Sequence, residues 1–207
     1  MKISQKFIRE DCVEIAKGLL TKLKFHSKET YEHSLDVAKI CLMLGRTQKL
    51  SNDDLKTLYT CGLLRDVGKL NIDTNLLHKK GCTIEEINYI KNTHILQTFK
   101  ILKGKIDEDL LNICYHHHEQ PNGEGYPQKL NNKQLSTFDK ILQVADKVSA
   151  VTLSRSYRSK PYLEEDLEEL MKKHMKIGYF DKKYGEIALE KVVKERCLSK
   201  KETVQEF

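Results

Sequence analysis

Histidine and aspartate are the residue types in this chain whose spacing could support chemistry. The sequence contains eight histidines, and neutral imidazole together with carboxylate is a donor set that suits Zn, Fe or Mn. Lone histidines such as His26, His78 and His174 are interpreted as surface or core side chains. The other candidates follow one another on separate predicted helices or at helix ends. These six candidate metal ligands are His33, Asp66, His94, His117, His118 and Asp146.

The elements that carry these candidates must converge if the candidates are to share a site. Apolar residues recur every three or four positions along most of the chain, which predicts amphipathic helices. Ser51 with Asp54 and Thr83 with Glu86 have capping-box spacing, and Gly45 is the expected stop of the second helix. The predicted helices span about 8–23, 29–44, 51–66, 83–94, 110–114 and 138–148, followed by a charged helical tail from 163 with a break near 178. With no convincing strand pair, we expect a single-domain all-α bundle that brings the ligands to one central site.

Composition and charge exclude several classes of protein. The 207 residues are 39% hydrophobic and 32% charged, which is typical of a soluble globular domain. The net charge is +6 without a basic tail, so a nucleic-acid polymer is not an expected partner. No apolar run reaches the ~18 residues of a membrane-spanning helix and no signal core is visible, so we expect a cytoplasmic protein without a membrane partner. The six cysteines lack CxxC spacing and are predicted to be buried free thiols.

A family resemblance begins at the paired histidines. The run HHEQPNGEGYP, residues 117–127, resembles the HHExxDGxGYP signature of HD-GYP domains, a branch of the HD superfamily of metal-dependent phosphohydrolases. Asn122 replaces the more common Asp of that signature and keeps a short, turn-forming side chain. Further segments resemble the family in the same order, namely ETYEHSLDVA (29–38), LLRDVGKLNID (63–73), KKGCTIEE (79–86) and ILQVADKVSAVTLSRSYR (141–158).

The resemblance covers about residues 26–190 and implies a helical domain of the HD/HD-GYP type, in agreement with the periodicity. It divides the chain into an N-terminal helix packed on the domain (1–25), the HD-GYP-like domain (26–190) and a charged C-terminal tail (191–207).

Active HD-GYP domains hydrolyse cyclic dinucleotides, chiefly cyclic di-GMP, with two or three Fe or Mn ions. The resemblance implies one metal site made of Asp66, His94, His117 and His118. It implies a neighbouring site made of His33, the histidine of the HD pair, Asp66 and Asp146, with Asp66 bridging the two. Glu29, one helical turn before His33, takes the place where some members supply a ligand for a third metal. Such metals lower the pKa of bound water and hold the phosphodiester for attack.

The resemblance also assigns residues to the substrate. Lys69 matches the lysine of the HDxGK run, so it shares a catalytic role with Asp66 by stabilising phosphate charge or protonating the leaving oxygen. Lys69 is expected to bind the substrate too, as are Arg155 and Arg158, which match residues that clamp phosphates. A solvated helix end is the alternative for the two arginines. Tyr126 lies in the GYP loop, where ligand contact and a purely structural turn both stay open.

Arg65 is the departure that matters, because it stands where the family has the metal-binding histidine of the HD pair. A guanidinium group stays protonated and has no lone pair to offer a cation. The hypothesis is that one metal binds at the intact site and that Arg65 pairs with Asp146, Asp66 or Glu29 in place of the second metal. Ser149 is a weaker departure, at a position where many members carry a second Asp.

Two classes of function therefore stay open. The first is a metal-dependent phosphohydrolase that cleaves cyclic di-GMP or a related cyclic dinucleotide, with activity weakened by Arg65. The alternative is a catalytically degenerate domain that binds a cyclic dinucleotide or a protein. The retained ligands favour the enzyme, with one or two Fe or Mn ions and a cyclic dinucleotide as its ligand. A signalling-protein partner and a homodimer stay open.

Overall fold

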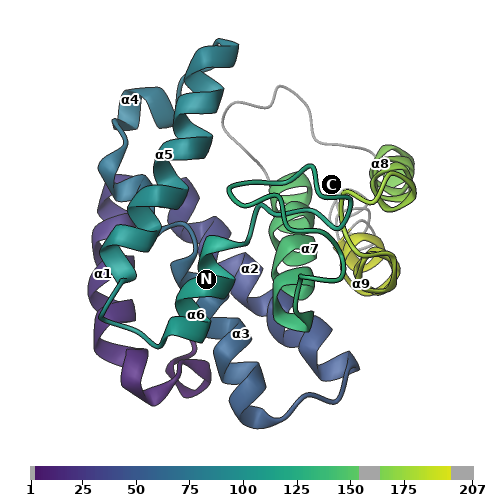
Figure 1. Ribbon diagram of the computed structural model, residues 1–207, viewed down its shortest axis with the longest axis horizontal. Helices are drawn as coiled ribbons and strands as arrows, with labels where there is room; N and C mark the ends of the chain where they lie inside the picture. Colours follow the sequence, from purple (N-terminus) through teal and green to yellow (C-terminus); the bar gives the residue numbers. More distant parts are fainter. Residues whose placement is uncertain (1–2, 154–163, 197–207) are drawn as a thin grey trace, which may run out of the picture.

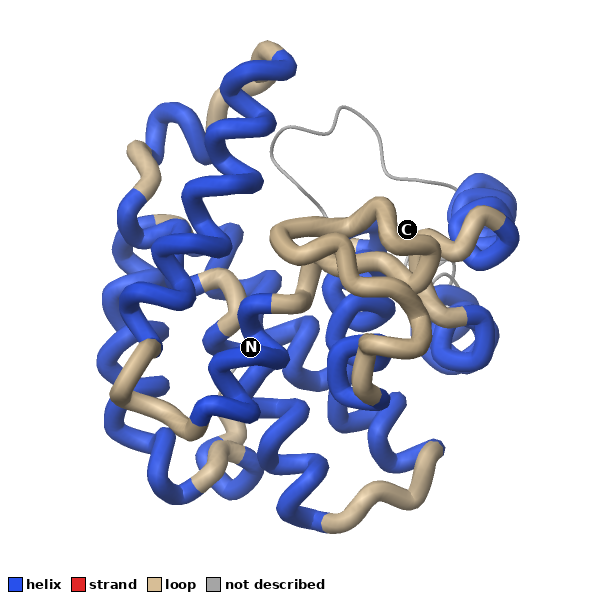
Figure 2. Tube along the Cα trace, viewed as in Figure 1, coloured by secondary structure: helices blue, strands red, loops and turns tan. Residues whose placement is uncertain are grey.

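The computed structural model describes residues 3–153 and 164–196. Arg155 and Arg158, which the sequence assigns to substrate phosphates, lie outside the described residues, as does Cys197. Within the described ranges the regular elements are all helices, apart from an isolated bridge between Asn122 and Asn131. The prediction of an all-α fold is therefore confirmed (Figure 2).

The longer helices lie in one bundle with an irregular loop region beside it (Figure 1). In chain order they are α1 (Val13–His26), α2 (Lys28–Thr47), α3 (Asn52–Leu64), α5 (Ile84–Leu102), α6 (Glu108–Tyr115), α7 (Thr137–Thr152), α8 (Glu164–Lys176) and α9 (Lys182–Ala188). Shorter turns of helix are η1 (Gln5–Phe7), η2 (Glu10–Cys12), η3 (Val67–Asn71), α4 (Thr74–Leu77) and the π-type η4 (Leu189–Val193).

Local sequence explains where several helices begin. The predicted capping boxes at Ser51 and Thr83 are both present and open α3 and α5. A third box, which the sequence analysis did not predict, opens α7 at Ser136. In each, the side-chain oxygen accepts a hydrogen bond from a backbone N–H that would otherwise lack a partner at the helix start. Two of the helices that carry site residues, α5 and α7, thus have starting points encoded in their own sequences.

Gly45 corrects one prediction, because α2 does not stop there but continues to Thr47. A Cβ atom at Gly45 would lie 2.7 Å from the side chain of Leu55 on α3. The glycine therefore lets α3 pack closely against α2 rather than ending the helix. The break predicted near Gly178 is confirmed: this residue has φ +69°, which glycine adopts without steric cost, and it separates α8 from α9.

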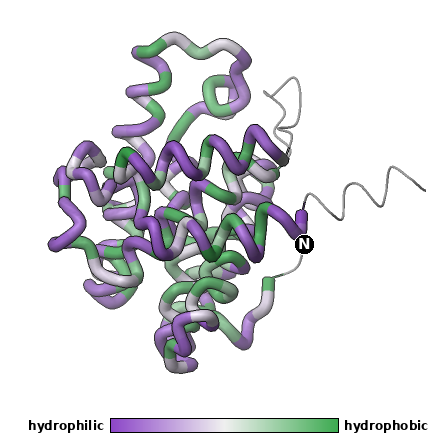
Figure 3. The backbone as a smooth tube through the Cα atoms, turned by 90° about the vertical axis from the view of Figure 1, so that its right-hand side faces the viewer, coloured by the Kyte–Doolittle hydropathy of each residue, from purple (hydrophilic) through white to green (hydrophobic). Residues whose placement is uncertain are grey.

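The core is centred on α2, which contacts α1, α3 and α7. A Cβ atom at Gly62 would lie 2.7 Å from the Cα atom of Ala38, so small residues let α2 and α3 approach closely. Figure 3 shows apolar and polar residues interleaved along the helices, as expected for helices that each bury one stripe. This packing fixes the spacing between the helices that carry the candidate ligands.

The five cysteines in the described residues are free, and four of them, Cys12, Cys41, Cys61 and Cys114, are buried as predicted. The fifth, Cys82, is half-buried. In the described part of the chain, no helix combines the length and apolar character needed to cross a membrane.

Candidate metal centre

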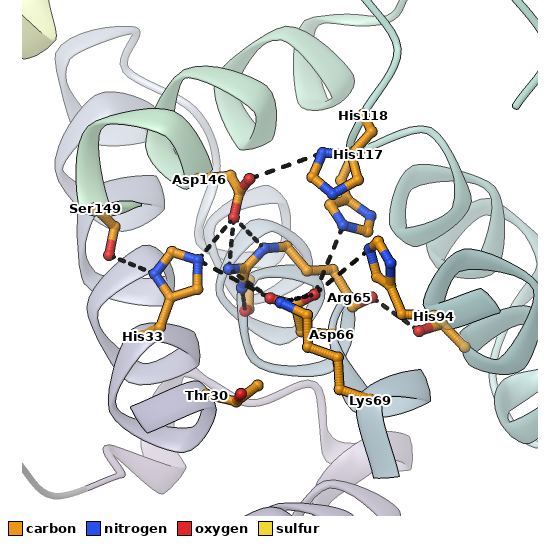
Figure 4. A network of polar contacts seen from close by, with 12 residues as sticks. Thr30, His33, Arg65, Asp66, Lys69, His94, His117, His118, Asp146 and Ser149 are labelled. Carbon is orange, nitrogen blue, oxygen red and sulfur yellow. Dashed lines mark hydrogen bonds and ion pairs between the residues drawn. The ribbon is translucent and has the colours of Figure 1, made fainter. Parts of the chain in front are cut away.

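Five parts of the fold bring the six candidate ligands together (Figure 4). His33 comes from α2, Asp66 from the junction of α3 and η3, and His94 from α5. The pair His117 and His118 follows α6, and Asp146 lies on α7. The ligand atoms form two groups, each with all its atoms within 4.8 Å of one another: His94, His117 and His118 in one, and His33, Asp66 and Asp146 in the other.

Asp66 is the carboxylate that faces the histidines of the first group. Its Oδ1 atom lies 3.8 Å from Nε2 of His94 and 3.9 Å from Nε2 of His117. A hydrogen bond on the side remote from Asp66 fixes the orientation of each ring. Nδ1 of His94 donates to the Ile90 carbonyl at 2.8 Å, and Nδ1 of His117 donates to the Cys114 carbonyl at 2.7 Å. With the proton on Nδ1, each Nε2 carries a lone pair directed at the shared space.

These inward-facing atoms fit a metal cation better than they fit one another. Nε2 of His94 and Nε2 of His117 are buried and make no hydrogen bond in the structure. Oδ1 of Asp66 is also buried without a hydrogen bond, although Nζ of Lys69 forms an ion pair with it at 3.0 Å. Buried polar atoms are normally paired, since desolvation without a partner costs about 1–3 kcal/mol. Because all three atoms are acceptors, only a cation or a donor placed among them can satisfy them together. The donor set of imidazole nitrogen and carboxylate oxygen suits a divalent transition metal.

The protonation states of this group also match those of metal ligands. Burial, followed by the charge of Lys69, lowers the pKa of His94 to about 3. Burial likewise lowers the pKa of His117 and holds the pKa of His118 well below its ordinary value. Burial opposes ionisation of Asp66, but the nearby Lys69 and Arg65 outweigh it and hold the pKa of Asp66 well below its usual range. At neutral pH the imidazoles are neutral and the carboxylate is ionised, as metal binding requires.

Arg65 occupies the space between the two carboxylates of the second group. Its guanidinium group is fully buried and donates to Oδ1 of Asp146 through Nε at 2.9 Å and Nη2 at 2.6 Å. The same Nη2 lies 3.1 Å from Oδ2 of Asp66, and Nη1 donates to the Gly62 carbonyl at 2.6 Å. Of the partners that the hypothesis named for Arg65, the structure has Asp146 and Asp66.

His33 is directed at Asp146 rather than at a shared space. Its Nε2 lies 3.0 Å from Oδ1 of Asp146, and its Nδ1 lies 2.9 Å from the hydroxyl of Ser149. The carboxylate can only accept, so Nε2 is the donor and Nδ1 accepts from Ser149. With its Nε2 lone pair replaced by a proton, His33 is a positioning partner of Asp146 in this arrangement.

Arg65 already supplies one positive charge to the second group, which offsets one of its two carboxylate charges. Burial opposes the charge on Arg65, but the attraction of Asp146 and Asp66 outweighs it and raises the pKa of Arg65. For Asp146, burial is outweighed by Arg65 and His33, which hold its pKa well below the usual range. A second divalent ion would meet this guanidinium at contact distance.

The sequence matches the family model described as HD domain over residues 12–183, most of the chain. The chain belongs to the HD domain family. This confirms the predicted HD-GYP resemblance. Among curated relatives, 3'3'-cGAMP-specific phosphodiesterase 1 of Vibrio cholerae is 29% identical over 181 residues, which are 86% of this chain and 41% of that protein. Cyclic di-GMP phosphodiesterase PA4108 of Pseudomonas aeruginosa is 28% identical over 141 residues, 67% of this chain and 34% of that protein. The chain therefore spans less than half the length of either relative.

Solved structures show the same fold. A crystal structure of a cyclic GMP-AMP specific phosphodiesterase of V. cholerae matches this HD domain with a TM-score of 0.62 and 21% identity, covering 90% of this chain and 50% of that one. At this level of identity the match supports the helical architecture, while the chemistry rests on the residues of the site.

Lys69 is a basic residue that lies beside the first group in this HD domain. Its Nζ atom lies 3.0 Å from Oδ1 of Asp66, the oxygen that faces His94 and His117. The side chain is 19% exposed and lines the cavity beside the ligands. A flexible ammonium group in this position can leave Asp66 and pair with an anion in the cavity.

The cavity beside this HD-domain centre has a volume of about 500 Å³, which lies within the usual range for small-molecule sites. It is lined by His94, His117, His118 and Asp146 of the ligand set and by Lys69 and Tyr126, as well as by residues that the sequence analysis did not select, chiefly Gln143, Lys147 and Tyr179. Helical spacing offered a signal for two of these, because Gln143 lies three residues before Asp146 on α7 and Lys147 lies four residues after Gln143.

The GYP loop is held by Glu119, another residue that the sequence analysis did not select. This buried carboxylate accepts from the backbone N–H of Gln128 at 2.5 Å and of Leu130 at 2.8 Å. Tyr126 contacts the ligand His118 in two ways. Its backbone N–H donates to the His118 carbonyl at 3.1 Å, and its ring centroid lies 5.0 Å from that of His118. The signal was available, because Glu119 is the Glu of the HHE signature.

Two other predicted residues stand apart from the two ligand groups. Oε2 of Glu29 lies 3.6 Å from Nδ1 of His78, and both line a different cavity with His26. His116, expected not to ligate, is directed away at Asp139, with 3.3 Å between its Nδ1 and Oδ1 of Asp139. Burial is outweighed by this contact, which raises the pKa of His116.

Proposed function

We propose that this HD domain is a metal-dependent phosphodiesterase that hydrolyses a cyclic dinucleotide at a centre with one Fe or Mn ion. Membership of the HD domain family and the names of the two relatives support the reaction class. Cyclic di-GMP and 3'3'-cGAMP are the substrates that those names carry, and either one is a candidate here.

The observation that carries the proposal is the set of inward-facing acceptors on Asp66, His94 and His117. The two imidazole nitrogens are buried without a hydrogen-bond partner, and His94 and His117 line a cavity that also has Lys69 in its wall. His118 completes the ligand set from the cavity side. When bound there, a metal ion supplies Lewis acidity and lowers the pKa of a coordinated water.

The chain's own residues perform the remaining tasks. Asp66 is the anionic ligand of the centre, and Lys69 leaves it to pair with a phosphate oxygen of the substrate, where it stabilises charge as the phosphodiester is cleaved. Arg65 supplies a fixed positive charge between Asp66 and Asp146 and holds both carboxylates in place. His33 orients Asp146 through the 3.0 Å contact. Tyr126 forms the wall of the cavity on the GYP side.

A single-turnover assay tests the proposal directly. The protein, purified anaerobically with Fe or Mn supplied, is placed in excess over cyclic di-GMP or 3'3'-cGAMP, and products are separated chromatographically. We expect linear dinucleotide or mononucleotide from the wild type, none from Asp66→Asn, and unchanged product from Asp73→Asn. Asp73 is a matched control because it caps α4 outside the site, where Asn caps as well as Asp. Equal product from Asp66→Asn would show that a contaminant does the chemistry.

A second function is favoured by the contacts of Arg65. A guanidinium group that lies between both carboxylates of the second group and pairs with each of them takes the place of the second ion of a two-metal hydrolase. The domain would then bind a cyclic dinucleotide and signal without cleaving it. Ligand that stays intact in the assay but raises the melting temperature of the wild type would support this function over turnover.

A further inference from the structure

One face of α7 lines the cavity over two helical turns. Gln143, Asp146, Lys147 and Ala150 all contribute to the cavity wall, and their spacing of three and four residues places them on one side of the helix. Asp146 is engaged by Arg65 and His33. Gln143 lies one turn before it and has no role in the chemistry proposed above.

Gln143 is buried yet unsatisfied. The residue is 5% exposed, and neither the amide nitrogen nor the amide oxygen has a hydrogen-bond partner in the structure. A buried carboxamide normally pairs both functions, since each unpaired group costs free energy. Gln143 therefore brings to the cavity wall a donor and an acceptor that no hydrogen bond uses.

Glu119 and Lys147, two charged residues of the same cavity wall, have other partners. The carboxylate of Glu119 is used by the backbone N–H groups of Gln128 and Leu130. Lys147 approaches the ring of Tyr179, with its Nζ 4.7 Å from the ring centroid and 3.5 Å from the hydroxyl. Lysine ammonium groups suit the phosphates of an anionic ligand. We therefore expect Gln143 to contact a part of that ligand other than its phosphates.

We propose that Gln143 is a specificity-determining residue that hydrogen-bonds the edge of a nucleobase of the substrate. A phosphate oxygen only accepts and would leave the amide oxygen unpaired. A nucleobase edge presents a donor beside an acceptor, and a glutamine amide pairs with such an edge through both of its functions, as with N6 and N7 of adenine. The inference rests on the proposed function for the class of ligand, and it assigns the part of the ligand that this residue reads.

Replacing Gln143 by Met tests whether the side chain contributes to base recognition or only to the stability of the fold. Methionine keeps the length of the side chain and removes the unpaired polar atoms, so the melting temperature of the ligand-free protein is expected to rise by about 2–4 °C. Binding is measured with hydrolysis-resistant phosphorothioate analogues of cyclic di-GMP, 3'3'-cGAMP and cyclic di-AMP on the metal-loaded protein. Gln97→Met is the matched control, because Gln97 pairs with Asn71 at 2.7 Å outside the cavity.

The wild type is expected to bind the best analogue about tenfold or more tightly than the worst, as one well-placed base contact allows. Gln143→Met should bring this ratio close to one, while Gln97→Met keeps it. A ratio that survives in Gln143→Met, or a wild type that binds all three equally, would overturn the inference. So would a lower melting temperature with an unchanged ratio, which would mean that Gln143 has a structural role only.

The outcomes also separate this inference from the proposed function. In one outcome, the wild type discriminates among the analogues, Gln143→Met does not, and the natural nucleotides stay intact. This outcome supports the contact between Gln143 and the base and overturns the proposed hydrolysis. If the natural nucleotides are hydrolysed and Gln143→Met keeps the affinity ratio of the wild type, hydrolysis is supported and the contact between Gln143 and the base is overturned. Absence of both binding and hydrolysis overturns the two together.

Discussion

Among single residues, Arg65 stands out because it adds a buried positive charge to the second group of ligands. It is among the largest fully buried side chains of the described chain, and a buried guanidinium group is tolerated only when its donors are paired. Asp146, Asp66 and the Gly62 carbonyl provide that pairing. At the position where the HD-GYP resemblance leads us to expect a neutral metal-binding histidine, this chain therefore has a fixed cation.

Restoring the histidine should restore a second metal. For the wild type we expect about one Fe or Mn ion per chain by elemental analysis, and about two for Arg65→His, because imidazole offers a lone pair where guanidinium offers none. With Mn(II), the variant should also show the exchange-coupled resonance of a metal pair. Arg46→His is the matched control, since Arg46 is exposed near the end of α2, and it should keep one ion. Two tightly bound ions in the wild type would contradict the role assigned to Arg65.

Elements are held around the site by contacts that side-chain chemistry alone does not reveal. Gly68 in η3 packs directly on α5, where a Cβ atom at this position would approach the backbone of His94 and Thr98 at 2.0 and 2.4 Å. Thr98 joins the two elements, accepting from the Gly68 N–H and donating to the Arg65 carbonyl, both at 2.9 Å. The distance between Asp66 and His94 therefore depends on the absence of a side chain at Gly68.

A methyl group at Gly68 should separate these elements. Gly68→Ala is expected to lower the free energy of unfolding by about 3 kcal/mol or more, because backbone atoms must move to make room, and to weaken metal binding. Gly18→Ala is the control: nothing lies within 4 Å of a Cβ atom at that exposed helical position. It should raise stability by about 0.5–1 kcal/mol. Urea titration of both variants measures the difference, and equal effects would contradict the packing argument.

Asn122 links the GYP loop to the segment between α8 and α9. Its side-chain amide donates to the Ile177 carbonyl at 3.1 Å and to Glu124 at 3.2 Å, while its Oδ1 accepts from the Glu124 N–H at 3.0 Å. The sequence analysis assigned Asn122 only a turn-forming role. An Asp, common at this place in the family signature, could not donate to Ile177.

Asn122→Asp should therefore loosen this link. Losing the donor and placing a carboxylate beside Glu124 is expected to cost about 1–2 kcal/mol, seen as a melting temperature lower by about 2–6 °C. Asn131→Asp is the control within the same bridge, because the side chain of Asn131 accepts from the Lys133 N–H and Asp accepts equally well. A fall of similar size in both variants would show that the loop tolerates neither charge and that donation to Ile177 is not the cause.

The whole molecule should show the cost of keeping a neutral histidine cluster buried. The pKa of His94 in the folded protein is about 3, whereas an unfolded chain has a histidine pKa near 6.5. Below pH about 6.5 the unfolded state therefore binds more protons, so this group makes the metal-free protein less stable as pH falls from about 6.5 to about 3. His117 and His118 act in the same direction. His116, whose pKa is raised, acts oppositely: its contribution is present below its unfolded pKa and is lost as pH rises through its folded pKa.

The expected result is a melting temperature of the chelator-treated protein that is highest near neutral pH and falls steadily toward pH 4. Differential scanning calorimetry between pH 4 and 8 measures it. His94→Gln should flatten the fall, because it removes one of the groups that take up protons on unfolding. A melting temperature that stays constant between pH 7 and pH 4 would contradict a buried neutral cluster.

The helical class, several helix starts and the candidate ligands could all be predicted from local sequence patterns. These depend on local properties, namely the 3.6-residue period, the reach of Ser51 and Thr83 to backbone N–H groups three residues on, and the inability of guanidinium to bind a cation. The sequence analysis also gave Asp146, Asp66 and Glu29 as the alternative partners of Arg65.

The packing of the helices fixes which of these partners Arg65 takes, the role of Gly45 in packing rather than helix termination, and the position of Glu29 beside His78. It alone brought Gln143 to the cavity wall with its amide unpaired. These outcomes depend on distances between elements far apart in the chain, and such distances are set by packing of the whole core around α2, which no local pattern contains.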